Sequence, residues 1–223
     1  MKTLVHLLTI IKDTHAKILS IDSFNSLLKI NKINFFGNGS SKFKNIIKSN
    51  KMTIRNILTE PNKLLRQISQ KVDKVGKDEQ KLMDDMLETM YSANGIGLAA
   101  IQIGIPKRII VMDISKESEK KNPRFFVNPI IKNKNLKKVT YEEGCLSVPN
   151  QFAEIDRPSE CDVEYLDYNG EKQIIHADGL FATCIQHEMD HLDGILFIDY
   201  LSKLKRSMII KKLSKQKLNT AIL

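Results

Sequence analysis

The segment QHEMDH at residues 186–191 most constrains the fold, because two histidines flank a glutamate at a spacing of four residues. On an α-helix, four residues advance about 6 Å and turn slightly more than once, so both imidazoles leave the same face and can share one cation. Glu188 lies about 100° round the helix from His187, where its carboxylate can act as a base without binding the cation. A chance pair on a surface helix is the alternative, but the pattern favours a metal-binding helix over 180–192.

The two histidines, His187 and His191, leave such a site incomplete, because catalytic zinc-type centres usually hold three protein ligands and one water. Phe197 stands where the metzincin pattern requires a third histidine, which excludes that class. No glutamate follows Glu188, which excludes the thermolysin-like peptidases as well. The third ligand is therefore expected upstream of the helix.

Four upstream residues are candidates for the third ligand. Cys184 shares the helix, but three ligands from one helix spread over about 10 Å of axis and cannot converge on one ion. Cys161 and His176 fall in expected strands, where packing is the ordinary role. Cys145 follows a β-rich run, and Gly144 beside it lets backbone approach a metal closely. Cys145 is the preferred ligand.

The body of the chain has the patterns of an α+β protein with antiparallel sheet. Apolar residues recur at helical spacing over 77–91, and Asn94-Gly95 supplies a stop. Short β-rich runs occupy 108–114 and 124–131, and two further runs, 161–167 and 172–176, flank the hairpin signal Asn169-Gly170. The metal helix ends at Gly194, and a basic amphipathic helix with Leu201, Leu204, Met208 and Leu213 closes the chain.

The positive charge is concentrated at the N-terminal end. Residues 1–51 hold nine lysines and two aspartates, which is +7 of the formal net charge of +9, so direct nucleic-acid binding by the body is not expected. An apolar run over 3–11 and an acid-poor stretch behind it resemble a targeting leader. A disordered extension is the alternative. We divide the chain into a leader, 1–51, and a body, 52–223.

Three segments resemble, in order, the signature motifs of the peptide deformylase family. They are GIGLAAIQ at 95–102, EGCLS at 143–147 and QHEMDHLDG at 186–194. The resemblance covers the chain from about residue 52 to the C-terminal helix and marks 52–223 as a deformylase catalytic domain. It implies antiparallel sheets packed around the metal helix.

The resemblance implies that Cys145, His187 and His191 bind one divalent metal per chain. Iron is expected in the cell, although zinc, nickel or cobalt suit the same ligands. The implied reaction is hydrolytic removal of the formyl group from the N-terminal N-formylmethionine of nascent polypeptides, with release of formate. A metal-activated water attacks the formyl carbon, and Glu188 is the general base.

The first motif also satisfies a loose dinucleotide fingerprint, Gly95-x-Gly97-x-x-Ala100. That fingerprint requires a preceding strand in a βαβ unit, whereas a helix is expected here. Gln102 instead presents an amide donor on a strand-like run. By resemblance, Gln102 and the backbone N–H of Leu146 form the oxyanion hole.

The family also implies residues that bind the methionine side chain and the peptide backbone. These are Ile96, Gly97, Glu143, Gly144, Leu180, Thr183 and Cys184. The peptide is expected as an extended strand beside Gly97. Family members often have arginine at the position of Phe152, so substrate preference or pocket shape is expected to differ there.

Two other functions could use the same helix. A zinc-dependent endopeptidase would cleave unformylated peptides and would require a third ligand other than Cys145. A structural metal-binding protein would close the site with Cys161 as a fourth ligand, but it has no need of a base at Glu188.

Formylated initiator methionine belongs to bacterial-type translation, so a deformylase behind a basic leader is expected in an organelle. We expect the plastid or apicoplast stroma, with the mitochondrion as the alternative. The expected partners are N-formylmethionyl nascent peptides near an organellar ribosome. No membrane span is expected, because no run of about eighteen apolar residues occurs.

Overall fold

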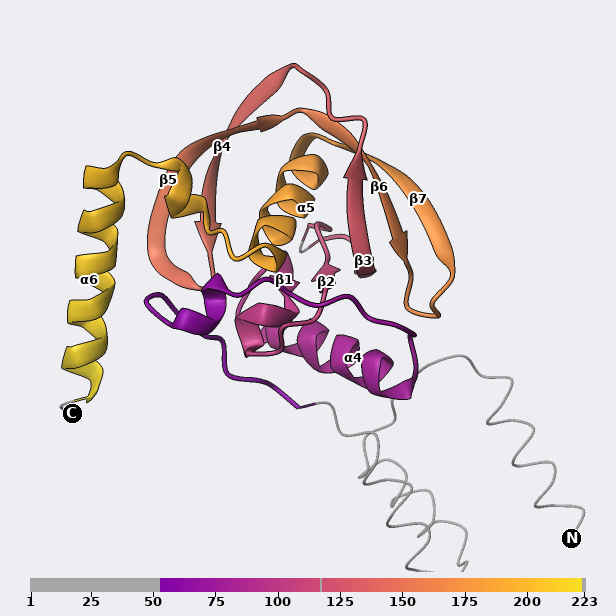
Figure 1. Ribbon diagram of the computed structural model, residues 1–223, viewed down its shortest axis with the longest axis horizontal. Helices are drawn as coiled ribbons and strands as arrows, with labels where there is room; N and C mark the ends of the chain where they lie inside the picture. The colour runs from indigo at the N-terminus through magenta and orange to yellow at the C-terminus, as the bar shows by residue number, and fades with distance from the viewer. Residues whose placement is uncertain (1–52, 117, 222–223) are drawn as a thin grey trace, which may run out of the picture. The chain divides into compact units, whose positions relative to one another are not determined.

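The computed structural model describes residues 53–116 and 118–221, and the expected leader lies outside this range. The described chain is an α+β fold with two antiparallel sheets, which confirms the predicted fold class. Figure 1 shows the metal helix, α5 (Gly179–Leu192), enclosed between the two sheets. In the same view, helix α4 (Lys77–Ser92) lies below strands β1 and β2, and helix α6 (Lys203–Ala221) lies beside strand β5.

The larger sheet has five strands in the order β1-β2-β3-β6-β7. Their bounds are Gly97–Ala99, Ile109–Met112, Arg124–Lys132, Glu160–Leu166 and Lys172–Asp178. Every neighbouring pair is antiparallel. The predicted hairpin between β6 and β7 is confirmed, and its turn places Gly170 at a φ of +82°, a conformation that glycine adopts without strain.

Strand β2 is buried on both faces because a helix covers each side of the sheet. Successive side chains of a strand point to opposite faces. Ile110 and Met112 accordingly belong to the apolar cluster of α5, whereas Ile109 and Val111 belong to that of α4. The uninterrupted apolar run of this strand follows from its central position.

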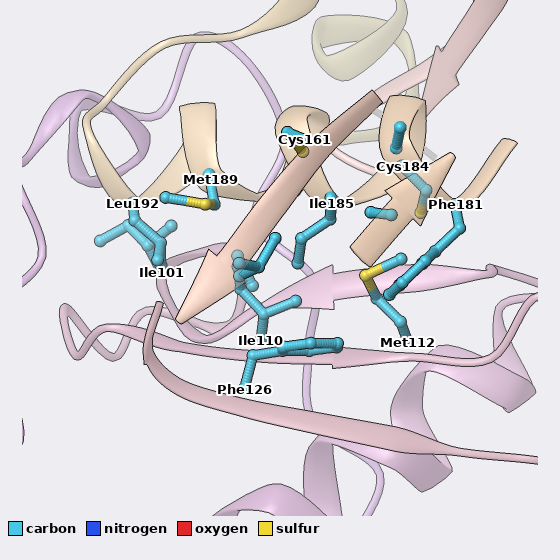
Figure 2. Packing of buried hydrophobic residues seen from close by; sticks show 14 residues of the cluster. Ile101, Ile110, Met112, Phe126, Cys161, Phe181, Cys184, Ile185, Met189 and Leu192 are labelled. Carbon is cyan, nitrogen blue, oxygen red and sulfur yellow. The ribbon is translucent and has the colours of Figure 1, made fainter. Parts of the chain in front are cut away.

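Helix α5 packs one face on this sheet and turns the other toward the second sheet. Figure 2 shows Ile185 of the helix above Ile110 and Phe126 of the sheet, and Met189 belongs to the same apolar cluster. His187 is two residues, or about 200°, beyond Ile185, so its side chain leaves the opposite face. The packing of α5 therefore aims the side chain of His187, a predicted metal ligand, away from the large sheet.

The second sheet is the hairpin of β4 (Lys138–Cys145) and β5 (Val148–Pro158). Three short 3-10 helices complete the described fold: η1 (Lys63–Arg66), η2 (Ala100–Ile103) and η3 (Phe197–Tyr200). A third apolar cluster joins β5, η3 and α6 and is made of Val148, Ile155, Leu196, Phe197, Ile198 and Leu213. None of the helices between residues 53 and 221 combines the length and the apolar character needed to cross a bilayer.

The predicted apolar face of the C-terminal helix is only partly correct. Leu213 is buried, but Leu201 precedes the helix, and Leu204 and Met208 are 72% and 62% exposed. Helix α6 packs mainly on β5 and η3, through Leu213 and the half-buried pair at 209–210. The contact is therefore narrower than the apolar pattern, and part of that pattern faces solvent.

Candidate metal centre

Cys145 is positioned by an irregularity at the end of the β4–β5 hairpin. Gly144 pairs with Phe152, whereas Cys145 pairs with Val148, so the register shifts between these two residues of β4. A bulge of this kind bends the strand and redirects a side chain. The shift explains how a strand-end cysteine meets a helix that follows it by some forty residues.

The structure brings Cys145, His187 and His191 together. One ligand atom from each lies within 4.8 Å of the others, and Sγ of Cys145 is 3.2 Å from Nε2 of His191. Both histidines are buried, and Cys145 is half-buried. One thiolate and two imidazoles form a donor set that suits a divalent transition metal, so the residues present fit such an ion.

Hydrogen bonds fix the orientation of His187. Its Nδ1 lies 2.8 Å from Oε2 of Glu143, which leaves Nε2 for the metal. Glu143 is held in turn by Arg157, whose Nε donates to Oε1 and whose Nη2 donates to Oε2. Burial opposes the charge of Glu143, but the bonds from His187 and Arg157 outweigh it and lower the pKa of this carboxyl.

The two histidines have different electrostatic surroundings. Burial and the neighbouring His187 hold the pKa of His191 well below its usual value, which favours the neutral imidazole that binds metals. Burial also opposes charge on His187, but the contacts with Cys145 and Glu143 outweigh it and raise its pKa. Positive charge is thus favoured on His187 and disfavoured on His191, although the two rings are neighbours.

Glu188 lies in the same cleft, where it can serve as a base. The side chain is almost fully buried, and its Oε2 has no hydrogen-bond partner among the described residues. Burial raises the pKa of Glu188 to about 7. A carboxylate with a pKa near neutrality and a free oxygen is suited to take up and return a proton.

Gln102 lies on η2 and not on a strand, so the predicted strand-like run is wrong at this point. The chain turns after β1 because Oε1 of Gln102 accepts a hydrogen bond from the N–H of Ala99 at 2.8 Å. This bond directs the amide nitrogen the other way, to 3.1 Å from Oγ of Ser147 and 3.6 Å from Sγ of Cys145. The predicted donor therefore faces the candidate metal.

A cleft of about 480 Å³ opens beside these groups. It is lined by the predicted site residues Ile96, Gly97, Gln102, Glu143, Gly144, Cys145, Leu146, Leu180, Thr183, Cys184, His187 and Glu188, and also by Phe152. His191 does not line the cleft, although its ligand atom lies within 4.8 Å of those of Cys145 and His187. The structure thus gathers into one place residues from three separate sequence motifs and from the first turns of α5.

The other three ligand candidates, Cys161, His176 and Cys184, do not join the group of converging ligand atoms. Cys161 is buried in the apolar cluster of α5, and His176 is an exposed residue that pairs with Asp162 at 2.9 Å. Cys184 lines the cleft, but it is not among the three ligand atoms that converge. Burial raises the pKa of its thiol well above the usual value, which keeps it neutral.

Sequence reasoning missed a set of polar residues behind the ligands. Arg157 donates through Nη1 to Oδ2 of Asp190 at 2.8 Å, and the hydroxyl of Tyr200 donates to the same oxygen at 2.9 Å. Arg157 therefore links Glu143 on β4 to Asp190 on α5. The position of Asp190 between the two histidines was the available signal, but its partners come from distant segments.

Comparison with known proteins identifies the family to which this chain belongs. A family model described as polypeptide deformylase matches residues 54–207. The chain belongs to this family. It is therefore a metal-dependent hydrolase that removes the formyl group from the N-formylmethionine of nascent peptides.

Curated relatives are similar over nearly their whole length. A peptide deformylase of Pelagibacter ubique is 74% identical over 171 residues, which cover 77% of this chain and 99% of the relative. One of Maricaulis maris is 56% identical over 164 residues, which cover 74% of this chain and 94% of the relative.

Solved structures share the fold. A peptide deformylase of Ehrlichia chaffeensis superposes with a TM-score of 0.72 at 44% identity, covering 77% of this chain and 100% of that chain. The same protein in complex with actinonin gives 0.71 at 47% identity, covering 74% and 98%. Peptide deformylase 1B of Arabidopsis thaliana gives 0.68 at 32% identity, covering 75% and 94%.

Proposed function

We propose that Cys145, His187 and His191 hold the catalytic metal of this deformylase, with iron as the ion in the cell. The observation that carries this assignment is the convergence of one sulfur and two imidazoles within 4.8 Å, beside the buried carboxylate of Glu188. A strand end and a helix supply the three ligands, so the site depends on the complete fold of the body.

The bound metal supplies a Lewis acid that polarises the formyl carbonyl and acidifies a water molecule. Glu188 accepts a proton from the attacking water and returns it to the amine nitrogen as the carbon–nitrogen bond breaks, so formate and a free N-terminus leave. The amide of Gln102 and the N–H of Leu146 donate to the formyl oxygen as negative charge develops on it. The hydrogen bond between Gln102 and the N–H of Ala99 orients this donor before substrate arrives.

We assign the inner part of the cleft to the methionine side chain. Ile96, Leu180, Thr183 and Cys184 line it and present mainly apolar surface. Gly97 lets the peptide backbone approach, and Glu143 and Gly144 also line the cleft. The deformylase of Ehrlichia chaffeensis has been solved in complex with actinonin, which supports ligand binding by proteins of this fold.

Formate release by anaerobically purified protein, with its metal quantified, tests these assignments. We expect formate from formyl-Met-Ala-Ser in proportion to the bound metal. Cleavage of an unformylated peptide would indicate an endopeptidase. One bound metal per chain with no turnover of either peptide would indicate a structural site and would contradict the assigned mechanism.

We also propose that residues 1–51 direct the chain into a plastid-type organelle, with the mitochondrion as the alternative, where it acts on chains emerging from the organellar ribosome. The support is the composition of this segment, with nine lysines against two aspartates behind an apolar start. The relatives named above from Pelagibacter and Maricaulis are bacterial and give this proposal no support.

A fusion of residues 1–51 to a fluorescent protein tests the targeting proposal. We expect import into the organelle, and a scrambled segment of equal composition serves as the control. A diffuse cytosolic signal from the native segment would contradict the proposal.

A further inference from the structure

Phe152 presents an aromatic ring at the mouth of the cleft. The residue is 66% exposed, although most large apolar side chains of the described fold are packed. Its ring lies against Gly144 of the neighbouring strand, where an added Cβ would be 2.6 Å from Cε1 of the ring. The absence of a side chain at Gly144 thus leaves room for the ring beside β4.

The same residue also lines a second hollow. A groove of about 860 Å³ runs between β5 and α6, and Gln151 and Phe152 line both this groove and the metal cleft. Its other lining residues are Ala153, Glu154, Leu201, Lys205, Met208, Ile209, Lys211 and Lys212. The groove therefore begins where the cleft ends, and the aromatic ring stands at the junction.

The groove combines an apolar floor with a basic rim. Met208 is 62% exposed there, although the same helix packs through its neighbours, so fold stability alone does not explain this side chain. Three lysines, Lys205, Lys211 and Lys212, stand along α6 against the single acid Glu154. Such a surface suits a peptide with an apolar residue next to acidic ones.

We propose that the downstream residues of the formylated substrate cross the ring of Phe152 and bind in the groove between β5 and α6. This inference rests on the proposed use of the cleft by the formylmethionine end. Continuity with that cleft favours the substrate as the occupant, because a peptide anchored at the metal must leave through the mouth that Phe152 lines. The preferred substrates are nascent chains with an apolar residue followed by acids after the third position.

Two formylated peptides of different length test the groove. Formyl-Met-Ala-Ser-amide ends near the mouth of the cleft, and formyl-Met-Ala-Ser-Leu-Glu-Glu-amide extends past it. We expect the KM of the longer peptide to be about tenfold lower at similar kcat, because burial of one apolar side chain contributes to binding beyond the reacting group. A version ending in Leu-Lys-Lys should lose most of this advantage.

Substitutions in the groove test whether its residues cause the difference in KM between the two peptides. Met208→Asp should bring the KM ratio of the two peptides close to one. Exchange of Lys211 and Lys212 for glutamate should reverse the preference between acidic and basic extensions. Ile174→Asp is the matched control, because Ile174 is a 73% exposed apolar residue on β7 that lines neither hollow, and it should preserve the ratio.

Turnover of the short peptide with an equal KM for all three peptides would overturn the groove proposal and leave the deformylase assignment intact. Absence of turnover for every peptide would instead contradict the proposed function. Equal KM values together with self-association that Met208→Asp abolishes, measured by sedimentation, would assign the groove to a second copy of the chain and would also overturn the proposal.

Discussion

Nδ1 of His187 and Oε2 of Glu143 lie 2.8 Å apart, and this hydrogen bond joins the metal helix to strand β4. Because the bond occupies Nδ1, it leaves Nε2 as the ring nitrogen available to the proposed metal. Arg157 contacts both oxygens of the same carboxylate and keeps it charged. Groups that orient metal-binding histidines in this way contribute to metal affinity although they do not touch the metal.

Replacing Glu143 tests this relationship. Glu143→Gln removes the charge that His187 and Arg157 contact, so metal affinity should fall about 10–100-fold. Competition with a chelator of known affinity measures the change. Glu142→Gln, at the exposed neighbour on the same strand, is the control and should retain the affinity of the unchanged protein. Equal metal affinities for the unchanged protein and both variants would show that the bond between His187 and Glu143 does not contribute to metal affinity.

Substitutions of Glu188 and of Cys145 are expected to have different effects on metal content and turnover. Glu188→Ala removes the base but no ligand, so the metal should remain while kcat falls about 10²–10⁴-fold. Cys145→Ala removes a ligand, so metal and turnover should both be lost. Metal content and formate release from the same preparations make the comparison. Full metal stoichiometry in Cys145→Ala would refute the ligand assignment.

Gln102 is expected to act on kcat more than on KM. Gln102→Glu keeps an oxygen that can accept from the N–H of Ala99 and removes the amide donor, so kcat should fall at least 10²–10³-fold with the metal retained. Gln173→Glu is the matched control, because Gln173 on β7 lines neither hollow and its amide donates to Oδ2 of Asp167. A similar loss of kcat in both variants would indicate a general effect of charge.

The parts of the fold that follow local patterns were predictable, and those that depend on distant contacts were not. The i, i+4 histidines require a helix, and Asn169-Gly170 requires a hairpin, so both elements followed from the sequence. The 3-10 turn at Gln102 forms because its own side chain bonds the backbone, which no periodicity reveals. Arg157 was missed for a related reason, since its partners come from β4 and α5, and only the folded chain brings them together.

Gly97 is expected to be required for the position of Glu188. A Cβ at Gly97 would overlap Oε1 of Glu188 and lie 3.0 Å from Sγ of Cys184. Gly97→Ala should therefore displace the carboxylate and lower kcat by about 100-fold, while the three ligands keep the metal. Gly76→Ala is the control, because a Cβ there meets only Oε2 of Glu79 at 3.5 Å, and it should leave kcat unchanged. Normal turnover in Gly97→Ala would show that the base tolerates displacement.

The pH dependence of stability should report on Asp85, which ties residues 53–55 to helix α4. Asp85 is fully buried and accepts hydrogen bonds from the N–H of Thr53 at 2.8 Å and from Nη2 of Arg55 at 2.7 Å. Burial opposes its charge, but these bonds and the one from Lys81 outweigh burial and hold its pKa below the usual 3.8. A carboxyl with a lowered pKa stabilises the fold above its unfolded pKa, and that contribution is lost as pH falls through the folded value.

Asp85→Asn should therefore lower the free energy of unfolding by about 1–3 kcal/mol at pH 7, as expected when a buried hydrogen-bonded partner is changed. The difference from the unchanged protein should stay constant down to about pH 5 and shrink below about pH 4, because protonated Asp85 then resembles the amide. Urea unfolding of both proteins at pH values from 7 to below 4 measures the difference in the free energy of unfolding. Asp73→Asn, which changes an exposed carboxyl outside α4, is the control. A difference that is independent of pH would mean that packing around residue 85, and not its charge, stabilises this contact.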